Sequence, residues 1–474
     1  MNNRAATKIE YGDFQTPAIL AQQICQKLIA LGVFPDLIIE PTCGVGTFIK
    51  AALQTFPTIE KIIGLEINSN YLQSLAEQKI AWEHAEKIEL IEGNFFEFDW
   101  KKVLDIQGSP LILGNFPWVT NAQQAVIQGK NLPPKTNFQH HLGMDALTGK
   151  SNFDISEWML LQIARGLQNR HGYLAMLCKT SVARKFLAHL RLERIGIRQS
   201  MLYQIDAKLH FNACVDACLL FCEFDPLSHD YDYLVYQSIE SEQGQWVGYR
   251  NGRAVRDIEK FEQLSQYDGH SKLCWRSGIK HDCSNVLELR QKDDNYFNKL
   301  GELVDIEPYY LYPLLKGSDI ANDRITHTER YLLTTQTNVG EDTDSIQKNA
   351  PKTWQYLEIH ASYFNARKSR IYRNHPRFSI FGVGNYSFAP YKIAICGLYK
   401  KLAFRLIQPI EQKAVVFDDT VYFLSFDDET EARSMFKILT SQDVLDFYAT
   451  LIFWDDKRPI KSNILNRLVL YRGN

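Results

Sequence analysis

Two glycines and one acidic residue, placed at the ends of neighbouring apolar runs, carry the first chemical signal in the sequence. Residues 38–48 read IIEPTCGVGTF, where Gly44 and Gly46 allow a turn with unusual backbone angles and the close approach of a ligand to the main chain. About 20 residues further on, a second run ends at Glu66, where an acid binds ribose hydroxyls. The loop is neither GxGxxG nor a lysine-bearing phosphate loop. A ribose-binding acid without a phosphate cradle favours S-adenosylmethionine over NAD or ATP.

The candidate cofactor-binding residues around this loop, besides its glycines and Glu66, are Thr16, Glu40, Thr42, Asn94 and Phe95. Thr16 followed by Pro17 predicts a helix N-cap and a first helical residue, and free N–H groups at a helix N-terminus attract a carboxylate such as that of the cofactor's methionine. Asn94 follows a third apolar run and is a candidate for reading the adenine edge, with Phe95 flanking the ring. The alternative interpretation of these residues is a helix cap, a loop amide and a core phenylalanine.

A fourth apolar run leads into Asn115-Phe116-Pro117-Trp118. This tetrapeptide resembles the Asn-Pro-Pro-Tyr motif of the amino-group methyltransferases. In that chemistry the Asn115 side-chain oxygen and the Phe116 carbonyl accept both hydrogens of an exocyclic amine and push its nitrogen towards sp³. Pro117 stiffens the turn, and Trp118 stacks on the base. Phe116 stands where the commonest motif has proline. Asn-hydrophobic-Pro-aromatic also resembles the ribosomal-RNA adenine dimethylases, so an RNA substrate is an alternative.

The order of these motifs resembles the gamma class of DNA adenine-N6 methyltransferases, the class of the TaqI enzyme. Asn152-Phe153-Asp154 resembles the family's segment that lines the catalytic pocket, and Phe211 resembles the aromatic that stacks on the target base, with a core role as its alternative. The resemblance implies methyl transfer to N6 of an adenine. Because N6 of a stacked, paired adenine cannot enter a pocket, the base must flip out of double-stranded DNA.

Alternating strand and helix patterns place these motifs at strand ends. Strands are expected over residues 37–40, 61–65, 87–91, 111–114, 172–178 and 213–221, and helices over 17–30, 47–55, 70–85 and 154–168. This alternation predicts an α/β fold with a parallel sheet covered on both faces. We expect a Rossmann-like S-adenosylmethionine-dependent methyltransferase domain over 1–230. A C-terminal mixed α/β target-recognition domain should follow over 231–474, where 313–320, 378–386 and 417–423 resemble family segments.

A basic stretch in the second half is the candidate DNA-binding surface. The chain's net charge is only -2, yet residues 361–413 carry ten lysines and arginines against one acid, Glu411. Such a local surplus suits a phosphate backbone, and a solvated basic face is the alternative. The residues nominated for DNA binding are Arg367, Lys368, Arg370, Arg373, Arg377, Lys400 and Lys401.

Composition narrows the classes of protein to which the chain can belong. The 474 residues are 45% hydrophobic and 23% charged, which is typical of globular proteins. The sequence shows no apolar run of membrane-spanning length and no signal-peptide core. Its nine irregularly spaced cysteines fit reduced thiols. We therefore expect a cytoplasmic protein without a membrane partner.

Metal binding and different methyl-transfer chemistries can be weighed in the same way. Cys214, Cys218 and Cys222 would lie ~13 Å apart along a strand, and His140-His141 lacks a matching acid or cysteine, so no metal is expected. The catalytic segment has no Pro-Cys nucleophile for methylation of cytosine C5, whereas methylation of cytosine N4 stays open as an alternative.

The resemblance implies double-stranded DNA as partner and allows a cognate restriction endonuclease. Methylation of a ribosomal protein amide also stays open, as does a non-catalytic DNA-binding relative in which Phe116 marks a decayed site.

Overall fold

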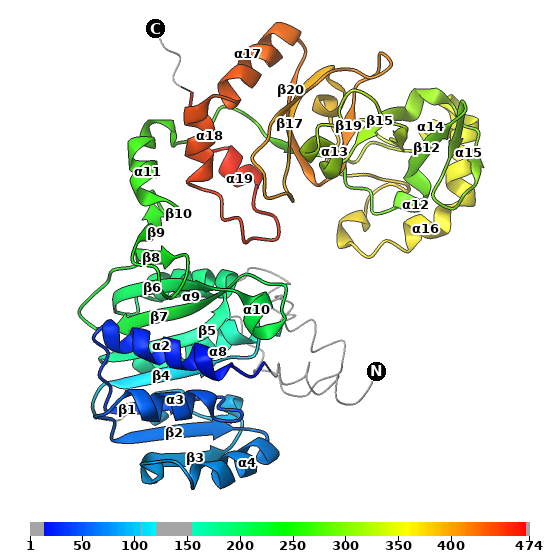
Figure 1. Cartoon of the computed structure of the whole chain (residues 1–474). Helices are drawn as coiled ribbons and strands as arrows, with labels where there is room; N and C mark the ends of the chain where they lie inside the picture. Colours follow the sequence, from blue (N-terminus) through cyan, green and yellow to red (C-terminus); the bar gives the residue numbers. More distant parts are fainter. Residues whose placement is uncertain (1–13, 106, 120–153, 471–474) are drawn as a thin grey trace. The chain divides into compact units, whose positions relative to one another are not determined.

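The computed structural model describes residues 14–105, 107–119 and 154–470, which divide into two compact units, Met1–Ala254 and Val255–Asn474 (Figure 1). The His140-His141 pair, Asn152 and Phe153 lie outside the described residues. Within the described ranges, no helix is both long and apolar enough to cross a membrane.

Unit 1 contains a ten-stranded sheet with the order β10-β9-β8-β6-β7-β5-β4-β1-β2-β3. Its strands are β1 (Leu37–Glu40), β2 (Lys61–Glu66), β3 (Ile88–Glu92), β4 (Pro110–Asn115), β5 (Gly172–Lys179), β6 (Ile197–Ile205), β7 (Ala217–Phe224), β8 (Tyr233–Tyr236), β9 (Gly244–Arg250) and β10 (Arg253–Val255). Its helices are α2 (Ala18–Ala30), α3 (Thr47–Thr55), α4 (Ser69–Lys79), α5 (Trp100–Val103), α8 (Ile155–Leu167), α9 (Thr180–Glu193) and α10 (Ala207–Phe211), with 3-10 turns η1 (Ala85–Lys87) and η2 (Phe95–Glu97).

The strand directions place the candidate site. Neighbours among β1 to β5 pair in parallel, while β7 runs antiparallel between β5 and β6. From β1 the chain adds β2 and then β3 on one side, and it returns to add β4 on the other side of β1. The strand order therefore switches between β1 and β4. In open α/β sheets, ligands bind at the carboxyl ends of the strands beside such a switch point. Glu40 and Asn115 end these two strands, and Glu66 ends β2 beside them.

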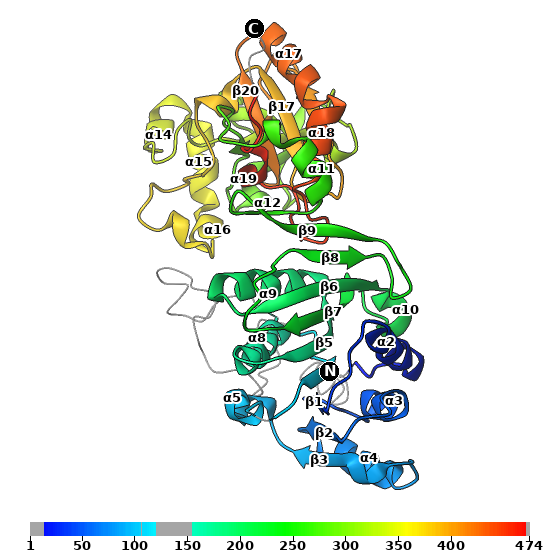
Figure 2. The same cartoon turned by 90° about the vertical axis from the view of Figure 1, so that its left-hand side faces the viewer.

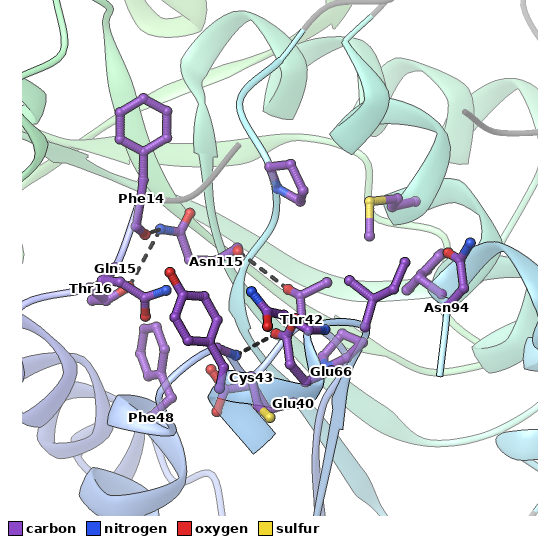
Figure 3. Close-up of a pocket in the computed structure, with 18 of the residues that line it drawn as sticks. Phe14, Gln15, Thr16, Glu40, Thr42, Cys43, Phe48, Glu66, Asn94 and Asn115 are labelled. Carbon is purple, nitrogen blue, oxygen red and sulfur yellow. Dashed lines mark hydrogen bonds between the residues drawn. The ribbon is translucent and has the colours of Figure 1, made fainter. Parts of the chain in front are cut away.

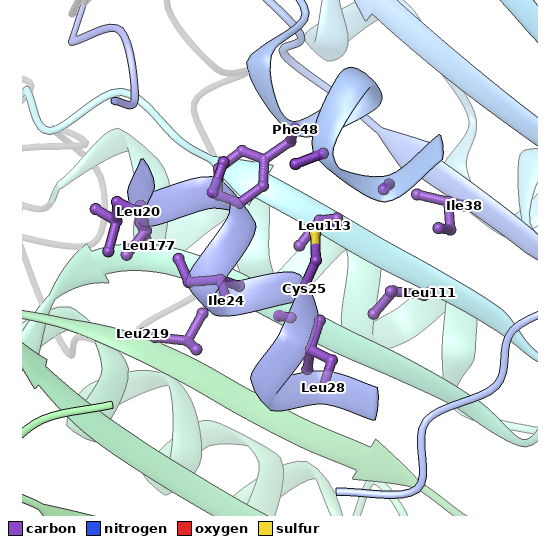
Figure 4. Close-up of a cluster of buried hydrophobic side chains, with 14 of the residues drawn as sticks. Leu20, Ile24, Cys25, Leu28, Ile38, Phe48, Leu111, Leu113, Leu177 and Leu219 are labelled. Carbon is purple, nitrogen blue, oxygen red and sulfur yellow. The ribbon is translucent and has the colours of Figure 1, made fainter. Parts of the chain in front are cut away.

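Helices cover both faces of the parallel strands, with α2, α3 and α4 on one side and α5, α8 and α9 on the other (Figure 2). Helix α2 forms because its apolar residues recur at helical spacing: Leu20, Ile24 and Leu28 are fully buried against the sheet. They meet Leu111 and Leu113, alternate residues of β4 that share one face (Figure 4). This packing fixes the segment just before α2 above the strand ends.

The sequence placed most of these elements correctly but did not indicate β6, α5, α9 or α10. Beyond the expected boundary at 230 it predicted short strands without placing them. Polar residues such as Arg198, Gln199 and Gln204 interrupt the apolar run of β6, which hides its strand pattern. The predicted strand over 213–221 begins later, at Ala217, because α10 and its left-handed C-cap Asn212 occupy the preceding residues. The compact unit ends at Ala254 rather than 230, because β8 pairs with β6 and β9 with β8.

Unit 2 has a mixed α/β architecture with two sheets, ordered β11-β20-β17-β18 and β14-β13-β12-β16-β15-β19. Its strands are β11 (Arg276–Ser277), β12 (Glu288–Lys292), β13 (Asn295–Phe297), β14 (Leu303–Val304), β15 (Leu311–Leu315), β16 (Arg330–Leu333), β17 (Tyr391–Cys396), β18 (Arg405–Ile407), β19 (Val416–Phe417) and β20 (Val421–Phe426). Its helices are α11 (Ile258–Gln263), α12 (Ser284–Leu287), α13 (Gly317–Ala321), α14 (Ser345–Asn349), α15 (Pro351–Ile359), α16 (Ala361–Asn365), α17 (Glu429–Leu439), α18 (Gln442–Ala449) and α19 (Ser462–Leu465). Parallel pairing of β15 with β19 brings the segments 313–320 and 417–423 side by side.

Candidate active site

A pocket in unit 1 lies at the carboxyl ends of β1, β2, β3 and β4 and is closed on one side by residues 14–16 (Figure 3). The residues nominated from the sequence that line it are Thr16, Glu40, Thr42, Gly44, Glu66, Asn94, Phe95, Asn115 and Pro117. Gly46, Phe116, Trp118 and Phe211 are not part of its lining. The topology therefore brings most of the predicted cofactor and catalytic residues around one cavity.

The glycine loop is tied to the end of β2 by Glu66. Gly44 N–H donates to Glu66 Oε2 at 2.7 Å, and Asn68 N–H donates to Oε1 at 2.8 Å. Gly44 and Gly46 both have positive φ, +52° and +78°, a region that favours glycine. Glu66 lines the pocket, and its carboxylate is an acceptor of the kind that hydroxyl groups of a ligand bind.

Replacing Gly46 by alanine should destabilise unit 1 by about 2–5 kcal/mol. A left-handed alanine costs roughly 1–2 kcal/mol, and overpacking adds about 1–3 kcal/mol. The added Cβ would clash with a Leu75 methyl group, and Leu75 is fully buried. Gly32→Ala is the matched control, because Gly32 has a φ of +79° but nothing within 4 Å of an added Cβ. Urea unfolding should show a clearly smaller loss for the control; equal losses would contradict the packing argument.

The Asn115 side chain is oriented by residues far away in the sequence. Its Nδ2 donates to the Phe14 carbonyl at 3.0 Å and to Thr16 Oγ1 at 3.4 Å. Its Oδ1 is buried and has no hydrogen-bond partner among the residues that the structure describes. Thr42 Oγ1 donates to the Asn115 carbonyl at 3.4 Å, which ties the loop after β1 to the end of β4. An unpartnered buried acceptor at the pocket is costly unless a ligand satisfies it.

The predicted N-cap role of Thr16 is wrong. Helix α2 begins at Ala18 and its N-cap is Pro17, while the Thr16 hydroxyl accepts from the Asn115 amide instead. The Pro17 carbonyl accepts from Ala21 N–H, which is the first bond of the helix. Thr16 is buried and lines the pocket, so its side chain faces the site rather than the helix end.

Glu40 is a second buried acid in the pocket. Only 4% of it is exposed, and no described residue forms a hydrogen bond with its Oε2. Burial raises the pKa of Glu40 well above its ordinary value, the Ile49 backbone N–H opposes this rise, and the negative charge of Glu66 adds to it. A cationic or amine group brought into the pocket would stabilise the ionised form of this carboxyl.

The aromatic residues of the predicted catalytic set are packed in two clusters. Phe116 is 1% exposed and contacts Phe95 edge-on, with ring centroids 5.4 Å apart. The Trp118 ring contacts the rings of Phe211 and Phe14, with ring centroids 4.9 Å and 5.7 Å apart, respectively. Both Trp118 and Phe211 are buried, so the structure brings the two nominated base-stacking residues together as an aromatic cluster beside the pocket.

Several lining residues were not nominated from the sequence. They are Phe14, Gln15, Pro41, Cys43, Thr47, Phe48, Ile67, Asn68, Tyr71, Gly93, Phe96, Val119, Ile155 and Met159. Ile67 and Asn68 could have been found, because they directly follow the strand-end acid Glu66. Ile155 and Met159 share a face of α8 at a spacing of four residues, but a core helix has the same pattern.

The basic stretch of unit 2 separates into internal and exposed cations. The Arg367 guanidinium donates to the Ser379 carbonyl at 2.6 Å and stacks on Tyr372, with its central carbon 3.6 Å from the ring centroid. Arg377 forms a bidentate pair with Glu358. The nominated cations that are exposed, apart from the paired Arg377, are Lys368, Arg370, Arg373, Lys400 and Lys401. Among the described residues, no group of three or more His, Cys, Asp or Glu could hold a metal ion.

Comparison with known proteins identifies the family. The chain is 52% identical over 472 residues to the Type II methyltransferase M.NspV of Nostoc sp. strain PCC 7524, covering 99% of this chain and 98% of that protein. The chain belongs to the type II methyltransferases. These enzymes methylate DNA within restriction–modification, so the prediction of a restriction–modification DNA methyltransferase is confirmed at this level. No protein-family model matches the sequence.

A solved structure supports the architecture. The chain superposes on the Type IIL restriction-modification enzyme MmeI, solved in complex with DNA, with a TM-score of 0.51 and 14% sequence identity. The match covers 89% of this chain and 61% of the MmeI chain, so this chain spans less than two thirds of MmeI. At this identity the likeness concerns the fold, and it confirms the predicted fold class of a methyltransferase domain followed by a mixed α/β region.

The pocket of this methyltransferase fits S-adenosylmethionine, the predicted cofactor, which the family membership confirms. Glu66 offers carboxylate acceptors at the end of β2 for the ribose hydroxyls. Glu40 Oε2 is a buried acceptor without a partner in the described part of the chain, and such an acceptor suits the ammonium of the methionine. Phe95 and Phe96 supply apolar wall on the side of β3 for a ring.

Glu66→Ala should weaken the binding of S-adenosylhomocysteine, the demethylated cofactor, by about 1.5–3 kcal/mol, which is roughly 10- to 150-fold. The change removes the carboxylate that we expect to bind the ribose hydroxyls, and it removes the two bonds that hold Gly44 and Asn68. Glu92→Ala is the matched control: Glu92 ends β3, pairs in register with Glu66 and is exposed outside the pocket lining. Calorimetry should show an unchanged affinity for the control, and an unchanged affinity for Glu66→Ala would reduce Glu66 to a strand-end charge.

Proposed function

We propose that this chain is a site-specific DNA methyltransferase of the gamma class that transfers a methyl group from S-adenosylmethionine to N6 of an adenine. The observation that carries the proposal is the Asn115 amide. Both its hydrogens are directed to protein acceptors, while its oxygen is buried at a cofactor pocket and finds no partner within the described ranges 14–105, 107–119 and 154–470. An exocyclic amine is the donor that this oxygen suits.

The roles of the chain's own residues follow from the chemistry of that amine. Asn115 Oδ1 accepts one N–H of the amine and the Phe116 carbonyl accepts the other, which draws the lone pair of the nitrogen out of conjugation with the base ring. S-adenosylmethionine, when bound, supplies an electrophilic methyl group. Pro117 lines the pocket and restricts the turn that aims both acceptors. No general base is needed, because the amine proton can leave after transfer.

Access to the amine requires that the base leave the duplex. Asn115 lies at the end of a central strand and its side-chain oxygen is buried, so N6 of a stacked adenine would not reach it. Flipping costs a few kcal/mol, and stacking on aromatic side chains compensates for part of it. Trp118 and Phe211 are the proposed stacking residues, and the Phe14 ring contacts both of them.

We assign target recognition on double-stranded DNA to unit 2. Its exposed cations between residues 368 and 401 support this assignment, as does the fold likeness to MmeI, a protein solved with DNA. The proposal places the chain in a restriction–modification system in which its methylation protects sites from a cognate endonuclease.

Single-molecule sequencing of DNA from cells that express the chain tests the proposal, because it reports the modified base, its position and the surrounding motif. The expected result is N6-methyladenine at one short motif, absent from cells without the gene. Methylation of cytosine N4 at a motif would reject the adenine assignment. Unmodified DNA combined with methylated RNA would favour the RNA alternative, and no transfer at all would favour a non-catalytic DNA-binding relative.

A further inference from the structure

The segment Phe14-Gln15-Thr16 contacts both the glycine loop and the end of β4. The Phe14 carbonyl and the Thr16 hydroxyl accept from the Asn115 amide. On the other side, Gln15 Oε1 accepts from Val45 N–H at 3.4 Å, next to Gly44. All three residues line the pocket, and Thr16 is only 8% exposed. The segment is therefore placed to hold Asn115 at the wall of the pocket.

We infer that Thr16 is a positioning residue for methyl transfer: together with the Phe14 carbonyl it holds the Asn115 amide with its oxygen towards the substrate amine. This inference rests on the proposed function of Asn115. It goes beyond that function because it assigns Thr16, and the segment that carries it, to orientation of the catalytic amide rather than to contact with the cofactor.

Elementary hydrogen bonding decides which way the amide points. A carbonyl oxygen can only accept, so the atom of Asn115 that lies 3.0 Å from the Phe14 oxygen must be the nitrogen. The reversed amide would place two acceptor oxygens against each other in a buried site. The second amide hydrogen needs its own acceptor, and the Thr16 hydroxyl supplies it. With both hydrogens held, the amide plane is fixed, and Oδ1 is the amide atom left to accept from a substrate amine.

Neighbouring packing makes this arrangement rigid. The Phe14 ring contacts Trp118 and Phe211, so its carbonyl is anchored by the aromatic cluster. Helix α2 begins directly after Pro17 and buries its apolar face against the sheet. A misplacement of about 1 Å at a reacting group can lower a rate about 100-fold, so a lost anchor for the amide should act mainly on kcat.

The test compares Thr16→Val, Thr16→Ser and the wild-type full-length chain on duplex DNA. Thr16→Val has nearly the same shape but no acceptor for the amide hydrogen, and kcat should fall roughly 10- to 100-fold. The affinity for S-adenosylhomocysteine, measured by calorimetry, and the KM for DNA should stay within about three-fold. Thr16→Ser keeps the hydroxyl and should restore most of kcat.

Thr55→Val is the matched control, because Thr55 Oγ1 accepts from the Gln22 side-chain amide at 3.0 Å, also beside α2 but outside the pocket lining. It should leave kcat within about two-fold. An unchanged kcat in Thr16→Val would overturn the inference, and so would a loss confined to S-adenosylhomocysteine affinity, which is the signature of a cofactor contact. If the wild-type chain methylates cytosine N4 instead, the adenine assignment fails while the same variants, assayed on that amine, still test Thr16. A wild-type chain that methylates no amine overturns both.

Discussion

Asn115→Ala should lower the rate of methyl transfer by at least about 1,000-fold while the affinity for S-adenosylhomocysteine changes only a few-fold. The variant removes the side-chain oxygen that accepts from the substrate amine, and loss of one such preorganised group typically lowers kcat by about 100- to 1,000-fold. Here the oxygen also positions the amine for attack, which adds to the loss. Tritium transfer to duplex DNA and calorimetry measure the two quantities separately.

Asn94→Ala is the appropriate comparison, since Asn94 lines the same pocket on the side of β3 and its Oδ1 accepts from Phe96 N–H. Asn94→Ala should mainly affect cofactor binding, with a weaker affinity for S-adenosylhomocysteine and less than about ten-fold change in kcat at saturating cofactor. Near-normal turnover of Asn115→Ala would remove the central proposal. Loss of cofactor binding in that variant would instead assign Asn115 to the cofactor.

The part of the site that could be predicted is the part formed by strand ends. Parallel strands have their carboxyl ends at one edge of the sheet, so Glu40, Glu66 and Asn115 had to converge once the strands were identified. The apolar runs of β1, β2 and β4 are short and continuous because both faces are covered by helices, and this made them recognisable.

The contacts of residues 14–16 could not be predicted, because they depend on tertiary packing. Thr16-Pro17 has the local signature of a helix cap, and nothing in the sequence shows that α2 crosses the sheet so as to bring Phe14 and Thr16 to Asn115, about a hundred residues away. The same limit applied to Phe211. Its local sequence resembled a strand entrance, whereas the structure has the short helix α10 there, with Phe211 packed on Trp118.

Charge counting located the basic stretch but overstated its exposed charge. Lys392 lies in β17 with 1% exposure, and burial lowers its pKa to about 7. Arg405 pairs with Asp323, and Arg367 is engaged by backbone carbonyls. A sequence shows the number of cations, whereas their partners come from residues distant along the chain.

Removing the exposed cations Lys368, Arg370 and Arg373 together should weaken binding to all DNA sequences alike, roughly 100-fold at 0.15 M salt. Each phosphate contact contributes about 0.9 to the slope of log affinity against log salt, so three lost contacts should flatten the slope by roughly 3. The affinity for S-adenosylhomocysteine should not change, because its pocket is lined entirely by residues of unit 1. Fluorescence anisotropy over a series of salt concentrations measures both the affinity and the slope.

A second triple variant separates local contacts from net charge. Lys292, Lys348 and Lys437 are exposed cations of unit 2 outside the stretch, and their removal changes the charge of the chain by the same amount. This control should alter affinity only a few-fold and leave the slope nearly constant. If one of the stretch's arginines reads a guanine edge, its single replacement should relax discrimination at one base pair by about 1–3 kcal/mol with little change in slope. Equal behaviour of the two triple variants would make the stretch an ordinary solvated face, and unit 2 would then have to bind DNA through another surface.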